Sequence, residues 1–455
     1  MPLKKNDIVR LAVSGTTAEG QGVGRTEEGC VVFVPGAAEG DLLDVRILKV
    51  TKTVAYGKIE AIITPSPERV EPDCPAFPRC GGCVFRHIRY EEELRIKHRR
   101  VVDAFRKIGG IEASLRPIVG AEAPCGYRNK AQFPVGQSGE DLLIGFFAPH
   151  SHRIVPCKSC ALQPPIFEQV LKLTEEHIRT YHISVYDEAR HEGLLRHIYL
   201  RYAAGTKQLM VCLVLNGDFF PHADKLISRL RGEIPQLKSF LINRNTEKTN
   251  VVLGKTCLTL YGSDTITDTL CGLSVEISPL SFYQVNRAQT ERLYRLAGDC
   301  ASLTGRETVL DLYCGAGIIG LSMAGRAKQV IGVEIVPEAV ENAKRNAVRN
   351  GIHNARFLCS DVSGAASLLA GENISPDVVI LDPPRKGCAP GLLETVASRM
   401  DPKRIVYVSC DPATLARDCA RLSSLGYSVE HAIPVDMFPR TSHVECVVLM
   451  SKGEQ

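Results

Sequence analysis

The sequence lacks any apolar run of about 18 residues, the length that a membrane-spanning helix requires. The chain begins with MPLKKNDIVR, which also lacks the apolar stretch of a secretory signal peptide. We therefore expect neither a membrane span nor export, and we expect a cytoplasmic protein. Glycine (38 of 455 residues) and proline (26) are present at ordinary levels, which excludes collagen-like and low-complexity chains.

A large excess of charge of one sign is also absent. The chain has 55 Lys and Arg against 51 Asp and Glu, a formal net charge of +4. Because this excess is small, a nucleic-acid partner would have to meet a local basic patch. Residues 86–107 contain eight Lys and Arg against four acids. This stretch predicts either a surface that faces RNA or an ordinary solvated helix face.

Cysteine, in contrast, is abundant, with 17 residues, and in the cytoplasm we expect reduced thiols. Cys74, Cys80 and Cys83 lie within ten residues of one another. This density favours metal ligation over buried structural thiols, and a tetrahedral site needs a fourth ligand. The sequence offers Cys157 and Cys160 as candidates. Zinc and an iron–sulfur cluster both fit such a set of thiolates.

Changes in composition divide the chain into three parts. Residues 1–64 contain short runs of branched residues between glycine-rich turns, which predicts a small antiparallel β-barrel. Residues 65–280 contain the cysteine cluster, a predicted helix over residues 90–108 and a sheet-rich central domain. Residues 281–455 alternate strands with helices. Their strands are apolar throughout, which predicts a largely parallel sheet buried on both faces.

A glycine-rich motif in the last part indicates a nucleotide-type site. Residues 311–320 place G-x-G-x-x-G directly after a predicted strand and before a helix, where backbone can approach a ligand closely. Glu334 lies 19 positions after Gly315 at the end of the next strand, where an acid can accept hydrogen bonds from ribose hydroxyls. A dinucleotide and S-adenosylmethionine both fit this arrangement.

Two further motifs follow buried strands, so we expect them at the same edge of the sheet. Asp382 opens the motif DPPRKG, which taken alone could be a structural turn. Cys410 follows the strand of residues 404–409. A cysteine can be a small buried hydrophobe, but its position beside the predicted cofactor site favours a nucleophile.

Together these features resemble the RNA uracil-5-methyltransferase family over nearly the whole chain. The resemblance is carried by the barrel, which is similar to a TRAM domain, by the cysteine cluster and by five motifs. These motifs are FYQVN at residues 282–286, DLYCGAGIIG at 311–320, DPPRKG at 382–387, VSCDPATLARD at 408–418 and HVECV at 443–447. The resemblance implies an α/β fold, with a Rossmann-like S-adenosylmethionine-dependent methyltransferase domain, an N-terminal OB-like TRAM barrel and a sheet-rich central domain.

The resemblance also implies roles for individual residues. It gives Cys410 as the nucleophile and Glu445 as the base. It favours a 4Fe-4S cluster over zinc at the cysteine cluster. The implied contacts of S-adenosylmethionine are Gln284, Tyr313, Glu334 and Asp382, with Asp361 as a further contact, and the implied cluster ligands are Cys74, Cys80, Cys83 and Cys160.

The expected activity is methylation of carbon 5 of a uridine in RNA. Carbon 5 of uracil is a poor nucleophile, and a thiolate that adds to carbon 6 activates it. The barrel and the cysteine cluster resemble the ribosomal branch of the family, so 23S rRNA is the expected substrate and tRNA the alternative. A nicotinamide-dependent oxidoreductase would share only the glycine loop. A non-catalytic RNA-binding module would bind RNA without consuming S-adenosylmethionine.

Overall fold

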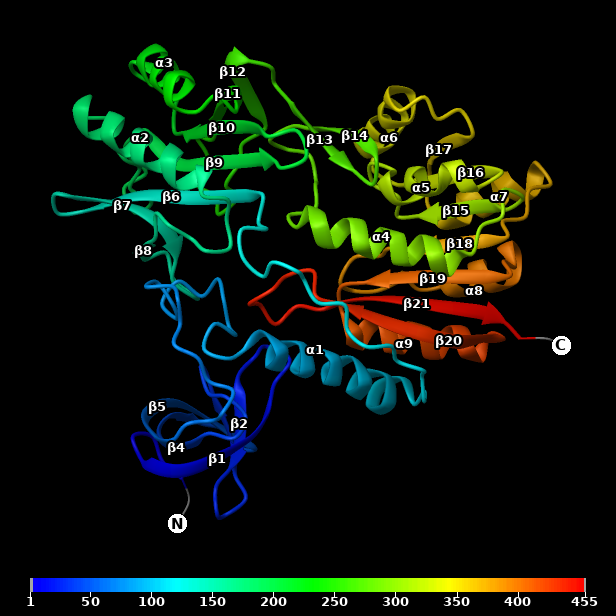
Figure 1. Cartoon of the computed structure of the whole chain (residues 1–455), viewed down its shortest axis with the longest axis horizontal. Helices are drawn as coiled ribbons and strands as arrows, with labels where there is room; N and C mark the ends of the chain where they lie inside the picture. The colour runs from blue at the N-terminus through cyan, green and yellow to red at the C-terminus, as the bar shows by residue number, and fades with distance from the viewer. Residues whose placement is uncertain (1–2, 454–455) are drawn as a thin grey trace.

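The computed structural model describes residues 3–453, which form a barrel and two seven-stranded sheets (Figure 1). The blue barrel and the green central sheet lie at one end of the molecule, and the C-terminal sheet lies at the other. The loop of residues 436–444, drawn in red, projects from the C-terminal sheet toward the other two parts. Val84 and Phe85 both donate backbone hydrogen bonds to Arg440 of this loop, which therefore joins the parts.

The N-terminal part is a closed barrel with strands β1 (Ile8–Thr16), β2 (Gly22–Arg25), β3 (Val31–Val34), β4 (Leu42–Val50) and β5 (Val54–Thr64). Alternate residues point inward, so Leu11, Leu43 and Val45 are almost completely buried. The predicted barrel is confirmed, although β3 and β5 pair in parallel. Strand β2 was not predicted, because two of its four residues are glycine, which is rare in strands.

The central part is a sheet with one face covered by helices. In spatial order its strands are β12 (Thr256–Gly262), β11 (Leu237–Arg244), β10 (Gln208–Leu215), β9 (Leu195–Ala203), β6 (Lys130–Ser138), β7 (Asp141–Phe147) and β8 (Ile154–Pro156). Helices α2 (Ile166–Thr180) and α3 (Ala223–Glu233) pack on it through a core that includes Leu200 of β9. Because side chains alternate along a strand, His197, Tyr199 and Arg201 point to the opposite face.

The C-terminal part is a sheet between two helical layers. Its strands, in spatial order, are β17 (Ala355–Cys359), β16 (Gln329–Glu334), β15 (Thr308–Leu312), β18 (Val378–Leu381), β19 (Arg404–Ser409), β21 (Glu445–Lys452) and β20 (Tyr427–Val435). The first five are parallel, as predicted, and β21 is antiparallel to both of its neighbours. A small hairpin, β13 (Ile266–Leu270) with β14 (Leu273–Ile277), packs beside this sheet.

Helices cover both faces of the C-terminal sheet. One layer contains α4 (Arg287–Ala301), α5 (Ile318–Met323) and α6 (Pro337–Arg349). The other contains α7 (Val362–Gly371), α8 (Leu392–Thr395) and α9 (Pro412–Ser424). This burial on both faces explains the unbroken apolar runs of the parallel strands.

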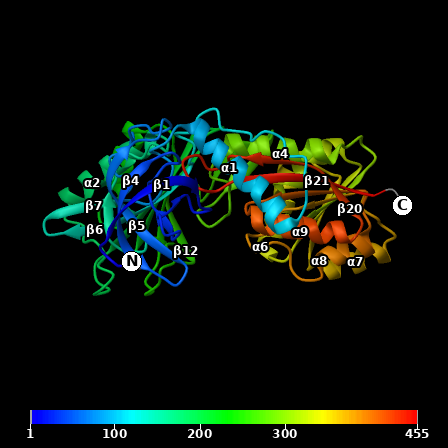
Figure 2. The same cartoon turned by 90° about the horizontal axis from the view of Figure 1, so that it is seen from below.

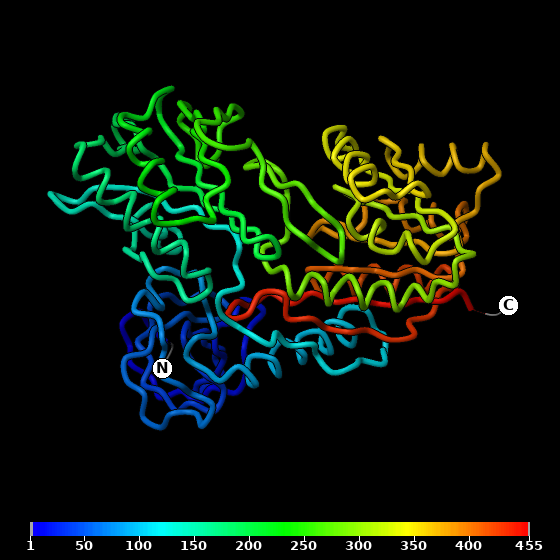
Figure 3. Tube along the Cα trace, turned by 45° about the horizontal axis from the view of Figure 1, so that its top comes forward, coloured from blue at the N-terminus to red at the C-terminus, as the bar shows by residue number. Residues whose placement is uncertain are grey.

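The helix α1 (Tyr90–Ala104) follows the cysteine cluster in sequence but packs on the C-terminal sheet. Val101 and Ala104 lie in the same buried cluster as residues of α9 and β20. Figure 2 shows α1 beside α9, and Figure 3 shows the chain after α1 returning to the central sheet. The division of the chain at residues 64 and 280 stays a prediction. Within residues 3–453, every helix is too short or too polar to cross a membrane.

Candidate active site

The candidate active site lies at the carboxyl edge of the parallel strands of the C-terminal sheet. Tyr313 directly follows β15, Asp382 follows β18 and Cys410 follows β19. Glu334 is the last residue of β16. The sequence motifs therefore meet at one edge, which is the edge where open α/β sheets bind their ligands.

The loop after β15 is a tight turn that exposes backbone to a ligand. Tyr313, Gly315 and Gly317 have positive φ angles of 63°, 53° and 79°. A Cβ atom at Gly317 would lie 2.7 Å from the ring of Phe357, so a side chain is excluded there. The Gly315 N–H donates a hydrogen bond of 3.1 Å to Glu334 Oε2, which fixes the acid beside the loop.

Two exposed apolar side chains follow Glu334. Ile335 is 68% exposed and Val336 is 46% exposed. Their backbone N–H groups both donate to Glu334 Oε1, at 2.8 and 3.0 Å. Because Glu334 Oε2 accepts only the bond from Gly315 among the described residues, this oxygen can accept a further hydrogen bond. An apolar surface beside an acid suits a nucleoside, whose flat base packs on the former and whose ribose hydroxyls reach the latter. These residues fit S-adenosylmethionine.

Three carboxyl groups near this edge have raised pKa values. Burial raises the pKa of Asp311 to about 7, that of Asp382 to about 7 and that of Glu445 to about 8. The charge of Asp382 adds to the rise at the other two. Asp311 was assigned no role from the sequence, although it is the charged residue of a fully buried strand. Its Oδ1 atom is buried without a hydrogen-bond partner among the described residues.

Cys410 and Glu445 come together through the pairing of β19 with β21. Ser409, which precedes Cys410, pairs with Cys446, which follows Glu445. Burial, together with the negative charges of Glu445 and Asp382, raises the pKa of Cys410 to about 11. The thiol is therefore protonated at neutral pH in the free protein, and its activation needs a nearby cation.

Arg385 is a cation that already acts on this thiol, and it was not identified as such from the sequence. It lies in the turn after β18, and its charge lowers the pKa of both Cys410 and Glu445. Its Nη2 atom lies 3.4 Å from His443 Nε2, on the loop that leads to Glu445. The sequence did contain a signal for Arg385, because the residue belongs to the DPPRKG motif. We expected this motif at the same sheet edge as Cys410.

Gln284 and Asp361 are held by local hydrogen bonds. Asn129 Nδ2 donates to the Gln284 carbonyl oxygen at 3.0 Å, which ties the segment before α4 to the central sheet. Asp361 is exposed and caps α7 by accepting a hydrogen bond of 2.7 Å from the Gly364 N–H. This cap accounts for Asp361 without a ligand. Cofactor contacts of both residues stay predictions.

The predicted cluster cysteines are gathered in one place. Cys74, Cys80, Cys157 and Cys160 pack around a small apolar cluster. The Cys157 thiol hydrogen-bonds to Cys160 and lowers its pKa to about 6, while burial raises the pKa of Cys83 to about 11. Within residues 3–453, however, no group of three or more His, Cys, Asp or Glu side chains is arranged to hold a metal ion. The predicted iron–sulfur cluster is therefore not supported.

The basic stretch of residues 86–107 uses most of its cations within the protein. Arg100 donates to the backbone oxygen of Ser442 at 2.8 Å. Arg89 and Arg106 are exposed and form no ion pair among the described residues. The cations of the stretch form the ion pairs Arg86–Asp73, Arg95–Glu68, Arg95–Glu92, Lys97–Glu93, Lys97–Asp436, Arg99–Glu39 and Lys107–Asp103.

The glycine turn, the acid at the end of the next strand and the largely parallel sheet are the features of a Rossmann-like, S-adenosylmethionine-dependent methyltransferase. The chain belongs to the tRNA (uracil-5-)-methyltransferase family, whose description matches residues 89–453, and it is accordingly an RNA (uracil-5-)-methyltransferase. The N-terminal barrel is a TRAM domain, which matches residues 2–59.

Relatives and solved structures agree with this assignment. An uncharacterized RNA methyltransferase of Clostridium tetani is 45% identical over 451 residues, covering 99% of this chain and 98% of the relative. One of Halalkalibacterium halodurans is 43% identical over 450 residues, covering 99% and 98%. The structure also resembles the Pyrococcus abyssi tRNA (uracil-54, C5)-methyltransferase in complex with S-adenosyl-L-homocysteine. The TM-score is 0.77 at 27% identity, covering 97% of this chain and 100% of the other.

Proposed function

We propose that this enzyme methylates carbon 5 of a uridine in RNA through a transient bond between Cys410 Sγ and carbon 6 of the base. The observation that supports it most is the placement of Cys410 beside Glu445 on paired strands at the ligand edge of the sheet. A uridine has to leave its stack to reach this edge, and an unpaired loop lowers that cost.

The proposed chemistry assigns one task to each of three side chains. S-adenosylmethionine supplies an electrophilic methyl group. The Cys410 thiolate adds to carbon 6, and carbon 5 then attacks the methyl group, whose bond to sulfur breaks so that S-adenosylhomocysteine is released. The Glu445 carboxylate removes the proton from carbon 5, and that electron pair re-forms the carbon 5–carbon 6 double bond and expels the thiolate. Arg385 favours the thiolate because its positive charge lowers the pKa of Cys410.

We propose Gln284, Tyr313, Glu334 and Asp382 as the residues that bind S-adenosylmethionine. The exposed Ile335 and Val336 support this proposal for the adenosine end. The positive-φ turn through Tyr313 and Gly315 supports the proposal for the amino-acid end of S-adenosylmethionine. Backbone N–H groups at the start of a helix bind carboxylates.

For the RNA, we propose 23S rRNA as the substrate and tRNA as the second candidate. The presence of both a TRAM barrel and a cysteine cluster supports the ribosomal branch. The likeness to the Pyrococcus abyssi enzyme, whose name specifies uracil 54 of tRNA, supports the second candidate. Both candidates would be modified in the cytoplasm.

One assay tests the proposal and separates the substrates. The enzyme is incubated with S-adenosylmethionine labelled in its methyl group and with unmodified 23S rRNA or tRNA, and the labelled nucleotide is then mapped. We expect 5-methyluridine in 23S rRNA and none with Cys410→Ala, which should still bind S-adenosylmethionine. Appreciable turnover by Cys410→Ala would refute the covalent scheme, and label in tRNA alone would replace the proposed substrate.

A metal at Cys74, Cys80, Cys83 and Cys160 is a separate proposal. Its support is the gathering of these thiols between two loops, and none of the steps above depends on it. Iron, sulfide and zinc are measured in protein purified without oxygen. We expect iron and sulfide in equal amounts, and stoichiometric zinc without sulfide would replace the cluster by a zinc site.

A further inference from the structure

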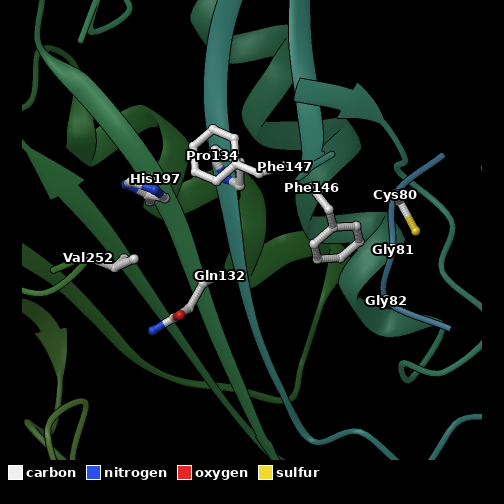
Figure 4. Close-up of a pocket in the computed structure, with 9 residues that line it drawn as sticks. All are labelled: Cys80, Gly81, Gly82, Gln132, Pro134, Phe146, Phe147, His197 and Val252. Atoms are coloured by element: carbon white, nitrogen blue, oxygen red, sulfur yellow. The ribbon is translucent and has the colours of Figure 1, made fainter. Parts of the chain in front are cut away.

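A small cavity lies on the face of the central sheet that is opposite to α2 and α3. It has a volume of about 290 Å³, at the lower end of the range for ligand pockets. Figure 4 shows its walls, with Gln132, His197 and Phe147 coming from three neighbouring strands and the loop of Cys80 closing one side. The residues that line it are Cys80, Gly81, Gly82, Gln132, Pro134, Phe146, Phe147, His197 and Val252.

His197 is the polar group that distinguishes this cavity from an apolar hole. Its side chain is almost fully buried, with 7% exposed, and its Nδ1 atom has no hydrogen-bond partner among the described residues. Burial and the neighbouring charge of Arg196 lower the pKa of His197 to about 4, so the ring is neutral. A buried nitrogen without a partner is costly, and the polar edge of a ligand would satisfy it.

The other walls suit a flat ring with polar edges. Phe147 meets the His197 ring edge-on, with 6.3 Å between ring centroids, so an aromatic surface and a hydrogen-bonding nitrogen stand side by side. Gln132 adds an amide that both donates and accepts. The lining contains no Asp or Glu, so a phosphate attached to the ligand would meet no carboxylate there.

The cavity is connected to the active site through β9. Tyr199 and Arg201 lie on the same face of this strand as His197, about 7 and 13 Å further along it. The Tyr199 hydroxyl donates to the Pro279 carbonyl at 2.9 Å, and Arg201 Nη2 donates to the Ser281 carbonyl at 2.5 Å. These bonds hold the segment that leads to Gln284, a proposed contact of S-adenosylmethionine, so β9 links the cavity to the proposed active site.

We propose that this cavity binds one unpaired base of the RNA substrate, a few nucleotides away from the uridine that is methylated. Phe147 packs against the base, and His197 and Gln132 hydrogen-bond to its edge. Stacking on aromatic rings and edge recognition are the usual means by which proteins select unpaired RNA bases. The inference rests on the proposed function, because it takes RNA as the ligand.

Two variants of the full-length enzyme test the inference. His197→Phe keeps an aromatic ring and removes the nitrogen, and Phe147→Ala removes the stacking surface. We expect each to weaken the binding of unmodified rRNA, or of tRNA if that is the substrate, about tenfold. The affinity for S-adenosylmethionine and the rate at saturating RNA should stay unchanged. Phe219→Ala is the matched control, because Phe219 is 70% exposed on the same central part and does not line the cavity.

The outcomes separate this inference from the proposed function. Unchanged RNA affinity in both variants would overturn the inference while leaving methylation by wild-type enzyme intact. If the wild type binds RNA but transfers no methyl group, the proposed function fails, and the binding measurements still decide the role of the cavity. Should His197→Phe fail to fold, Gln132→Ala at a half-buried position decides, with weaker RNA binding expected and unchanged binding overturning the inference.

Discussion

At the scale of single residues, the proposed role of Glu445 as the base makes the last chemical step depend on pH. A base has to be ionised to remove the proton from carbon 5, and burial raises the pKa of Glu445 to about 8. The ionised fraction therefore grows about tenfold between pH 7 and pH 9. We expect the single-turnover rate of elimination to rise by about that factor. Rapid-quench measurements at saturating RNA and cofactor would show it, and a flat profile would exclude Glu445 as the base.

Replacing Glu445 should stop the reaction after methyl transfer. Glu445→Gln keeps the shape of the side chain and removes its basicity, so the bond between Cys410 and carbon 6 cannot be released by elimination. We expect a protein–RNA adduct that survives denaturing electrophoresis and carries the labelled methyl group. Glu445→Asp keeps a carboxylate and serves as the control, with slower turnover and less adduct. Absence of the adduct in Glu445→Gln would contradict the assigned role.

Arg385 should set the reactivity of the Cys410 thiol. Its charge opposes the burial that raises the pKa of Cys410 to about 11, so Arg385→Met should raise that pKa further. At a fixed pH the variant then holds less thiolate and reacts more slowly with iodoacetamide. The pH profile of alkylation, read at the Cys410 peptide, measures this shift. Arg385→Lys keeps the charge, and an equal shift in both variants would show that charge is not the cause.

At the scale of elements, a buried ion cluster joins α1 to the loop that precedes β21. Lys97 is 1% exposed and contacts Glu93 Oε1 at 2.7 Å and Asp436 Oδ1 at 2.6 Å. Tyr90 donates to the other oxygen of Asp436 at 2.6 Å. Lys97 thus contacts both buried carboxylates, and Arg440 Nη1 lies 3.6 Å from Glu93 Oε2 as a second cation. Through this ion cluster, α1 helps to position the loop of residues 436–444, which leads to Glu445.

Removing this cation should destabilise the fold in a pH-dependent manner. Lys97→Met removes the ion-pair partner of Asp436 and leaves Glu93 with only the Arg440 contact at 3.6 Å, which costs about 3–5 kcal/mol. The folded pKa of Glu93 is already raised, to about 7, above its unfolded value. Without Lys97, Glu93 favours the protonated form more strongly, so the loss of stability grows as pH rises. Thermal unfolding at pH 6 and pH 8 measures this loss of stability. Lys107→Met is the control, because it removes the exposed Lys107–Asp103 pair and should change stability little.

The sequence predicted elements well where one pattern decided them. The strand at residues 404–409 and the helix opened by Pro337 have the predicted positions, because an apolar run and a proline start are local signals. The barrel strand β5 was missed, since it lacks a clear alternation of buried and exposed residues in its second half. The packing of α1 on the C-terminal sheet could not be predicted, because its apolar stripe does not specify a partner.

The same limit applies to the site. The parallel topology places the carboxyl ends of the strands at one edge of the sheet. For this reason Glu334, Asp382 and Cys410 could be grouped from the sequence. The contribution of Arg385 to the thiol depends on the path of a loop and became visible only in three dimensions. The roles of individual site residues stay predictions that the variants above test.

At the scale of the whole molecule, the path of the RNA depends on which cations are free. Within residues 86–107, most cations already face carboxylates, and a matched pair releases few counterions when RNA binds. The exposed Arg89 and Arg106 form no ion pair among the described residues, so they carry whatever contribution this stretch makes.

The salt dependence of RNA binding tests that contribution directly. In the double variant Arg89→Gln with Arg106→Gln, we expect the slope of log affinity against log salt to become shallower by about one to two. Arg99→Gln should leave the slope nearly unchanged, because Arg99 already pairs with Glu39 at 2.5 Å. Filter binding at several KCl concentrations measures both slopes. An unchanged slope in the double variant would remove residues 86–107 from the RNA path and leave the TRAM barrel and the central sheet to hold the phosphates.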